Sequence, residues 1–255
     1  MRRALLERLV PNALAAAAEG RRQGQVGPFA LFLSETSDDP MLSFAVPVAA
    51  AVEWRPAIAV LQRAFDDVGR RFRVEFFREL YPALSPTLFA MGYRREMEAP
   101  LMTLHAGDYR PAPVWAAALL DAGDDGGIDG LMQVQAEAFD GPLDTAGHQD
   151  FRGRLVQGLQ SGTRRAALAR LGGVPAASAL LLIGGGSAEL AAVGTRPPFR
   201  RRGLAEAVCR RLLDVHFADG HDLAWLSAAA GAEPLYIRLG FRLAGTQLNF
   251  GAEVS

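Results

Sequence analysis

The sequence has 255 residues, of which 50% are hydrophobic and 22% are charged, and its formal net charge is −1. These values are typical of a globular protein with one or two domains, each large enough to bury a core. All 27 basic residues are arginines, so the chain cannot form a lysine Schiff base, attach pyridoxal phosphate or build a phosphate loop that ends in Gly-Lys-Ser/Thr. A net charge near zero also argues against a general nucleic-acid-binding protein.

The cysteine and histidine residues exclude further kinds of site. Cys209 is the only cysteine, which excludes a disulfide framework and a cysteine-rich zinc site. The four histidines show no His-x-x-x-His spacing, so we expect no metal site. No apolar stretch approaches the ~18 residues that a membrane-spanning helix needs. We therefore expect a cytoplasmic protein that binds neither nucleic acid nor a membrane.

The first half of the chain begins with a predicted helix. Residues 1–18 are expected to be helical instead of forming a signal peptide, because Glu7, Arg8 and Pro11 interrupt the apolar run. The apolar run at 45–52 has the length of a strand.

A turn-rich stretch near the middle of the chain predicts a domain boundary. Residues 107–113 contain two prolines, which favour an extended connector. Both flanking halves alternate short apolar runs with helical patterns, as α/β units do. The predicted division is a first domain at 1–108, a linker at 109–113 and a second domain at 114–255.

The second half predicts a three-stranded meander followed by a crossover. Strands are expected at 165–171, 177–183 and 189–195, with glycine-rich turns between them. Apolar residues recur at helical spacing in 204–217, and 222–226 reads as another strand. A strand, helix and strand within about 40 residues imply that the two strands are parallel.

Three arginines and a glycine stand directly before the helix at 204–217. The first N–H groups of a helix lack intrahelical partners and lie at the positive end of its dipole, so they bind phosphate oxygens readily. Gly203 lets a phosphate approach the backbone, and the guanidinium groups of Arg200, Arg201 and Arg202 can add charge-assisted hydrogen bonds. The turn is therefore a candidate pyrophosphate site, although a solvated turn that merely starts a helix would carry the same residues.

Two motifs in this half resemble those of the GNAT superfamily of acyl-coenzyme A-dependent N-acyltransferases. Residues 200–205, Arg-Arg-Arg-Gly-Leu-Ala, resemble motif A, whose pattern is Arg/Gln-x-x-Gly-x-Gly/Ala. Residues 233–241, which end in Leu-Tyr-Ile-Arg-Leu-Gly-Phe, resemble motif B. The helix and strand between the motifs stand in the family's order, and the resemblance covers residues 114–255.

The resemblance implies a splayed sheet and a site for acetyl-coenzyme A (acetyl-CoA) as co-substrate. The pantetheine arm is expected beside the strand at 189–195, and the pyrophosphate on the turn and helix start that follow. The implied cofactor-binding residues are Val193, Gly194, Thr195, Arg200, Arg201, Arg202, Gly203, Leu204 and Ala205.

The resemblance also assigns roles in acyl transfer. Tyr236 stands at the position of the family's general acid, which protonates the leaving thiolate, and a packed aromatic residue is the other interpretation. Glu189 is the candidate base for the acceptor amine, or else a solvated strand end. Glu137 and Phe139 are candidates for acceptor binding. Ala229 stands where many family members carry an asparagine, so that polar contact is missing.

A shift of 148 positions lays the first half onto the second with the segments in the same order. The first-half segments that fall on the motif A helix, the next strand and motif B are 56–68, 71–77 and 85–94. Leu88 then falls opposite Tyr236 and Arg55 opposite Gly203, which would remove the proton donor and block the approach of a pyrophosphate. We therefore predict an α/β protein of two tandem GNAT-like domains, each a mixed splayed sheet flanked by helices, whose first copy has no acetyl-CoA site.

The expected activity is acetyl-CoA-dependent N-acetylation by direct transfer to a primary amine of a small molecule or peptide, with Tyr236 as general acid. The alternative is a non-catalytic acyl-CoA-binding sensor or interaction module with the same fold. The sequence leaves open which amine is the acceptor and whether the chain is a monomer or a homodimer.

Overall fold

The computed structural model describes residues 2–35, 39–113, 117–139 and 146–253. Residues 114–116, where the predicted second domain begins, lie outside the described part. The elements of the first half are α1 (Arg2–Ala18), β1 (Arg21–Val26), β2 (Phe29–Ser34), η1 (Pro40–Leu42), β3 (Phe44–Pro47), α2 (Trp54–Asp66), β4 (Arg73–Phe77), α3 (Leu84–Ala90), β5 (Arg94–His105) and η2 (Ala106–Asp108).

The second half has an additional strand and helix at its start and then repeats the order of the α-helices and strands. Its elements are β6 (Ala117–Leu119), α4 (Asp125–Ala138), α5 (Ala146–Ser161), β7 (Arg164–Leu171), β8 (Val174–Gly184), β9 (Ser187–Thr195), η3 (Pro197–Phe199), α6 (Leu204–Ala218), β10 (Leu223–Ser227), α7 (Glu233–Leu239) and β11 (Arg242–Gly251).

Most elements expected from the sequence are confirmed. The N-terminal helix is α1, the meander is β7, β8 and β9, and the motif A helix is α6. Strand β10 pairs with β9 in parallel, as the crossover predicts. The apolar run at 45–52 is strand only as far as Pro47, because the chain turns there toward α2.

The eleven strands of the described residues form one mixed sheet instead of one sheet for each half. Their order is β1-β2-β3-β4-β11-β5-β10-β9-β8-β7-β6. The four strands β1 to β4 and the four strands β7 to β10 run in mirrored order toward the centre, so the two halves occupy equivalent positions.

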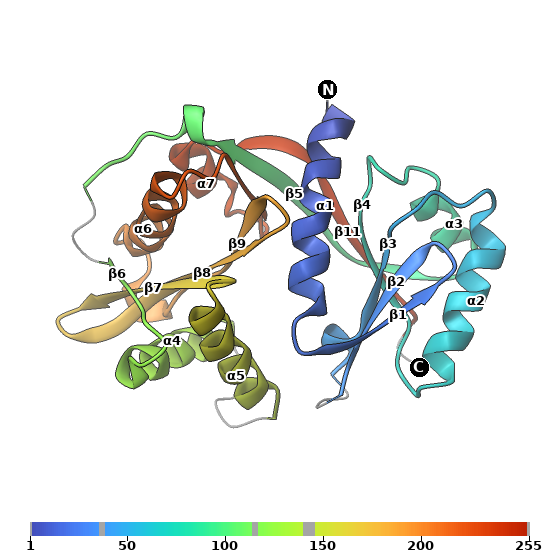
Figure 1. The fold of residues 1–255 in the computed structure, drawn as a ribbon, viewed down its shortest axis with the longest axis horizontal. Helices are drawn as coiled ribbons and strands as arrows, with labels where there is room; N and C mark the ends of the chain where they lie inside the picture. Colours follow the sequence, from blue (N-terminus) through green and yellow to red (C-terminus); the bar gives the residue numbers. More distant parts are fainter. Residues whose placement is uncertain (1, 36–38, 114–116, 140–145, 254–255) are drawn as a thin grey trace.

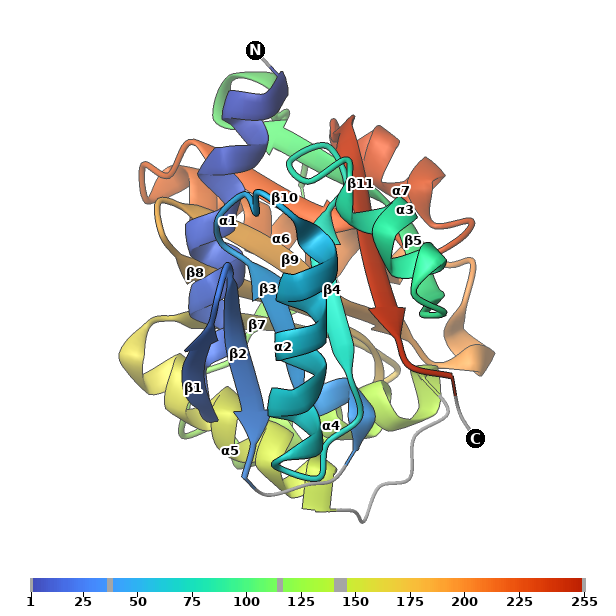
Figure 2. The same ribbon diagram turned by 90° about the vertical axis from the view of Figure 1, so that its right-hand side faces the viewer.

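The last strand of each half lies in the other half's part of the sheet. β5 pairs antiparallel with β10, from Leu223↔His105 to Ser227↔Leu101. β11 pairs antiparallel with β4, and Figure 2 shows these two strands side by side although one closes the chain and the other lies in its first half. β5 and β11 pair with each other at the centre. This exchange joins the halves through backbone hydrogen bonds.

Helices cover both faces of the sheet (Figure 1). In the second half α6 and α7 pack on one face, and α4 and α5 pack on the other. In the first half α2 and α3 cover one face, and α2 does so because its apolar residues recur at helical spacing. Those buried α2 residues are Trp54, Ile58, Leu61 and Phe65.

Helix α1 lies over the junction of the two halves (Figure 1). Leu6 and Leu9 are fully buried against a cluster that includes Trp225 of β10. Asn12 accepts a hydrogen bond from the Trp225 indole at 2.7 Å and donates one to the Leu182 carbonyl at 3.0 Å. A helix of the first half is thereby fixed to two strands of the second.

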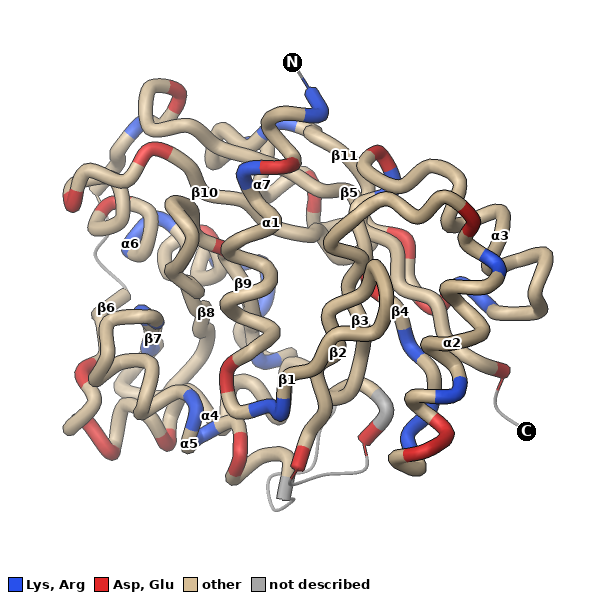
Figure 3. Tube along the Cα trace, turned by 45° about the vertical axis from the view of Figure 1, so that its right-hand side comes forward, with Lys and Arg blue, Asp and Glu red and all other residues tan. Residues whose placement is uncertain are grey.

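Two further features are the distribution of the charged residues and the length of the helices. Basic and acidic residues are interspersed along the trace (Figure 3). Among the helices of the described ranges, none has both the length and the apolar character needed to cross a membrane.

Candidate active site

Strand β9 carries a bulge just before the motif A turn. Its pairing with β8 passes from Leu180↔Ala191 to Ser178↔Gly194, so two β9 residues oppose one residue of β8. Ala192 has a φ of 52°, a left-handed conformation that is uncommon for a residue other than glycine. The Gln135 side chain of α4 holds the bulge by donating hydrogen bonds to the Ala192 carbonyl at 2.7 Å and to Ser178 Oγ at 2.8 Å.

The sheet opens directly beside this bulge. β9 and β10 pair only at Ala188↔Ala224 and Glu189↔Trp225. Beyond these two pairs the strands have no further ladder contact, which is the splayed arrangement that the resemblance implies.

The turn from β9 to α6 is folded back on itself by two left-handed residues. Arg201 has a φ of 63°, and Gly203, the residue that precedes α6, has a φ of 76°. Glycine adopts this conformation without steric cost. A Cβ at Gly203 would meet no atom within 4 Å, so the space next to this part of the backbone is open. Arg200 Nε donates to the Thr195 carbonyl at 3.2 Å and closes the turn.

A groove with a volume of about 1000 Å³ runs along the bulged end of β9, the turn and the start of α6. Its other wall is the segment between β10 and α7. The predicted cofactor-binding residues that line it are Val193, Gly194, Thr195, Arg200, Arg201, Gly203, Leu204 and Ala205. Arg202 is exposed and lies outside the lining.

The groove also contains residues that the sequence reasoning missed. Arg238 lines it from α7, one turn after Pro234, and donates to the Pro234 carbonyl at 3.0 Å. Arg238 and Glu206 form an ion pair at 3.5 Å across the groove wall. Arg238 stands within motif B, so helical spacing from Pro234 could have identified it. Gln135 had no sequence signal, because its partner strand is far away in the chain.

Tyr236 is packed in the core beneath α7. Only 7% of the residue is exposed, its ring contacts Phe241 edge-on at 6.0 Å, and it is not among the groove-lining residues. Burial, and secondly the thiol of Cys209, raise its pKa above the ordinary value, so the phenol stays protonated. Its hydroxyl has no hydrogen-bond partner within the described part of the chain, which leaves that proton available.

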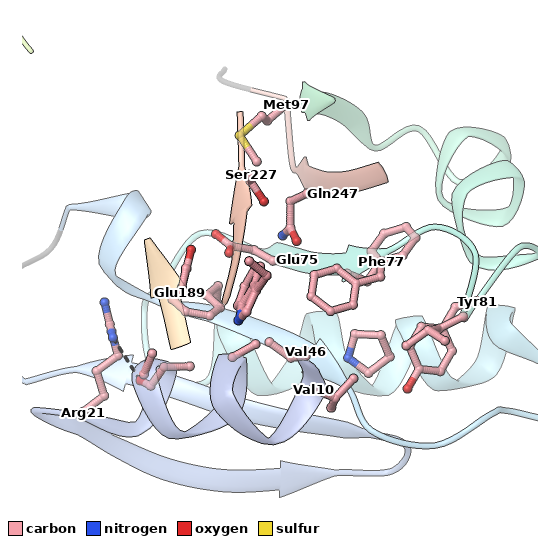
Figure 4. Close-up of a pocket in the computed structure, with 18 residues that line it drawn as sticks. Val10, Arg21, Val46, Glu75, Phe77, Tyr81, Met97, Glu189, Ser227 and Gln247 are labelled. Carbon is pink, nitrogen blue, oxygen red and sulfur yellow. Dashed lines mark hydrogen bonds between the residues drawn. The ribbon is translucent and has the colours of Figure 1, made fainter. Parts of the chain in front are cut away.

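Glu189 points away from α6, into a separate cavity between α1 and the sheet (Figure 4). Burial, and secondly the negative charge of Glu75, raise the pKa of Glu189 to about 7. A carboxyl group that titrates near neutral pH is suited to act as a general base. Cys209 is a free, buried thiol.

Of the two predicted acceptor-binding residues, one lines the groove and the other forms an ion pair outside it. Phe139 lines the groove and is 58% exposed. Glu137 accepts hydrogen bonds from Arg196 Nε at 2.7 Å and Gln133 Nε2 at 3.0 Å, and its pKa is lowered chiefly by Arg196. This ion pair ties α4 to the residue after β9, and Glu137 lines neither the groove nor the cavity.

Within the described ranges, no group of three or more His, Cys, Asp or Glu residues is arranged to hold a metal ion.

Comparison with known sequences identifies the family of the second half. The family described as "Acetyltransferase (GNAT) family" matches residues 128–241. This range runs from α4 to the end of motif B and contains the bulge, the turn and most of the groove. The comparison with curated proteins finds no match.

Solved structures resemble the chain over both halves. A GCN5-related N-acetyltransferase from Kribbella flavida is 25% identical, with a TM-score of 0.78 over 100% of this chain and 96% of that one. One from Sphaerobacter thermophilus is 16% identical, with a TM-score of 0.65 over 89% and 76%. A tandem GNAT protein from the clavulanic acid biosynthesis pathway is 14% identical and shares the fold, with a TM-score of 0.59 over 89% and 79%. Residues 128–241, with the bulged, splayed strands and the motif A turn, therefore match the GNAT family of acetyltransferases, and the chain as a whole is similar in fold to GNAT acetyltransferases over both halves.

Proposed function

We propose that the protein transfers an acetyl group from acetyl-CoA directly to a primary amine, with Glu189 as the base and Tyr236 as the general acid. The observation that carries this proposal is the groove, which collects the motif A turn, the bulge of β9 and the start of α6 in one place. The left-handed turn and the open space beside Gly203 suit the approach of a pyrophosphate to backbone N–H groups. The exposed side chains of Arg201 and Arg238 add positive charge.

Acetyl-CoA supplies an activated thioester. Amide formation removes two protons from a primary ammonium group, and the breaking C–S bond leaves a thiolate that needs one. Glu189 takes the first proton and passes it to solvent. Tyr236 gives its proton to the thiolate and regains one from the nitrogen. A carboxyl group with a pKa of about 7 is partly ionised near neutral pH and can accept a proton, and burial keeps the phenol protonated.

One observation favours the alternative of a binding module without catalysis. Tyr236 lies in the core and not in the lining of the groove, so a purely structural role would give it the same surroundings.

Replacement of the phenol separates these two functions. Tyr236→Phe should lower the turnover number roughly 100-fold or more, which is the usual contribution of a general acid, and leave the dissociation constant of acetyl-CoA unchanged. The measurements are thiol release in the presence of a panel of primary amines and calorimetric titration with acetyl-CoA.

A matched control is Tyr109→Phe, because the Tyr109 hydroxyl bonds to Asp214 at 2.7 Å on the far side of α6. This variant should lose stability and keep its turnover number. Equal turnover in the wild type and Tyr236→Phe would remove Tyr236 from the mechanism. Binding of acetyl-CoA with no thiol release above the hydrolysis background for any amine would favour the sensor.

A further inference from the structure

The cavity that holds Glu189 is built by both halves of the chain. It has a volume of about 270 Å³, just below the range of ~300–1,000 Å³ typical of small-molecule sites. Glu189 and Trp225 reach it from the second half, and Glu75 and Phe77 reach it from the first (Figure 4). Helix α1 closes it with small side chains, among them Ala13.

The cavity and the acetyl-CoA groove are lined by different residues of the same two strands. On β9, Glu189 lines the cavity and Val193 lines the groove. On β10, Ser227 lines the cavity, and Ala230, three residues later, lines the groove. Alternation of side chains along a strand turns Glu189 and Trp225 toward α1, while their neighbours pack under α6. The gap between β9 and β10 opens at Glu189↔Trp225, so the sheet is parted where the two spaces approach each other.

Two carboxylates converge in this cavity. Figure 4 shows Glu75 of β4 and Glu189 of β9 directed to the same region of it. The Glu75 side chain is 22% exposed and is held by an ion pair with Arg73 at 3.0 Å, while Arg73 is 3% exposed and also pairs with Glu96 at 3.7 Å. Glu75 is therefore fixed in position but still open to the cavity.

The positive charge near these carboxylates is already engaged. Arg21 lines the cavity, but its guanidinium donates to the carbonyls of Leu42 at 2.8 Å and Ala17 at 2.9 Å. Arg73 pairs with Glu75, and Glu96 pairs with Arg71 at 2.6 Å as well as with Arg73. Glu189 forms no ion pair with any described residue, so its carboxylate is the charge that a bound cation would neutralise.

The remaining walls are mostly apolar and aromatic. They include Phe44, Phe76, Phe77, Tyr81 and Trp225. Aromatic faces attract cations and pack against flat apolar groups. A small molecule that carries an ammonium group at one end and an apolar body at the other matches both the charge and the surface of the cavity.

We propose that this cavity is the acceptor site, and that it selects small primary amines with an apolar or aromatic body, whose ammonium group is held by Glu75 of the first half opposite Glu189 of the second. The inference rests on the proposed function, because it takes Glu189 as the base. It assigns the half without the arginine turn a direct part in choosing the acceptor. The ammonium loses one proton to Glu189 as described above. Burial raises the pKa of Glu75, and the Arg73 guanidinium opposes this shift and favours the ionised form that holds the nitrogen end in place.

The test uses the full chain with 2-phenylethylamine as the probe and 2-phenylethanol as its uncharged analogue. Glu75→Gln should raise the KM for 2-phenylethylamine at least about 10-fold, since it removes a charge-assisted contact, without changing the dissociation constant of acetyl-CoA. Glu96→Gln is the matched control, because it removes a carboxylate from the same Arg73 network outside the cavity lining. It should leave the KM for the amine unchanged.

A second variant covers the case in which Glu75→Gln fails to fold. Ala13→Phe places a ring in the cavity from α1 and should abolish binding of 2-phenylethylamine in calorimetry, with acetyl-CoA binding intact. The proposal is overturned if the amine does not bind the wild-type protein, if 2-phenylethanol binds equally well, or if neither Glu75→Gln nor Ala13→Phe weakens amine binding. Failure of acetyl-CoA to bind would refute the proposed function instead, since amine binding is measured without it.

Discussion

At the scale of single residues, the carboxyl group of Glu189 is the most informative. Burial and the charge of Glu75 raise its pKa from the ordinary 4.5 to about 7. Only the ionised form can accept a proton, so kcat/KM for an amine acceptor should rise with pH through about 7. Glu189→Gln should remove this rise and lower kcat/KM by roughly 100-fold, leaving only the ionisation of the acceptor amine in the pH profile.

The same group makes a prediction about stability that does not depend on activity. Between pH 4.5 and about 7 the folded chain keeps a proton on Glu189 that the unfolded chain has lost. The contribution of this group to the free energy of unfolding therefore falls as the pH rises through that window and is constant above it. Glu189→Gln should melt at a higher temperature than the wild type above pH 7 and close to it below pH 4.5. Parallel melting curves across the window would show that the pKa of Glu189 is not raised.

At the scale of elements, the bulge of β9 depends on one side chain of α4. Gln135 is the donor to the Ala192 carbonyl and to Ser178. Gln135→Leu should cost about 1–3 kcal/mol of stability, because the carbonyl loses its donor. It should also weaken acetyl-CoA binding, because Val193 and Gly194, which follow the bulge, line the groove. Thermal unfolding and calorimetric titration measure the two effects.

Gln133→Leu is the control for that change on the same helix. Gln133 donates to Glu137 at 3.0 Å, whereas the hydrogen bonds to the bulge come from Gln135. It should leave acetyl-CoA binding unaltered. Equal binding by the two variants would mean that the bulge forms without Gln135.

At the scale of the whole molecule, the exchange of β5 and β11 makes the halves interdependent. Without residues 1–113, β11 loses both of its neighbours and β10 loses β5. The fragment 114–255 should therefore fail to fold alone, and co-expression with 1–113 should restore a soluble complex that binds acetyl-CoA. Circular dichroism and gel filtration test this. A monomeric, folded 114–255 fragment that binds acetyl-CoA would instead support the predicted boundary at 109–113 as one between independent domains.

The offsets between equivalent elements of the two halves match the internal repeat predicted from the sequence. α7 begins 149 residues after α3, β10 begins 150 after β4, and β11 begins 148 after β5, close to the shift of 148 found in the sequence. α6 begins 150 residues after α2, so the structure places Glu53, and not Arg55 as the shift of 148 implies, opposite Gly203. Both alignments put a residue other than glycine at this position, and the absence of an acetyl-CoA site from the first half stays a prediction.

The sequence by itself predicted the meander, α6, β10, the motif A turn and the resemblance to the GNAT family, because each depends on residues that are close together in the chain. Such local patterns can be interpreted without knowledge of the fold. Examples are helical spacing, a glycine before a helix and a run of arginines. Only the tertiary structure decided which strands pair, because an alternating strand pattern specifies a buried face and not a partner. It also decided that Glu75 and Glu189 share one cavity, because β4 and β9 lie on either side of β11, β5 and β10 and both contribute a carboxyl group under α1.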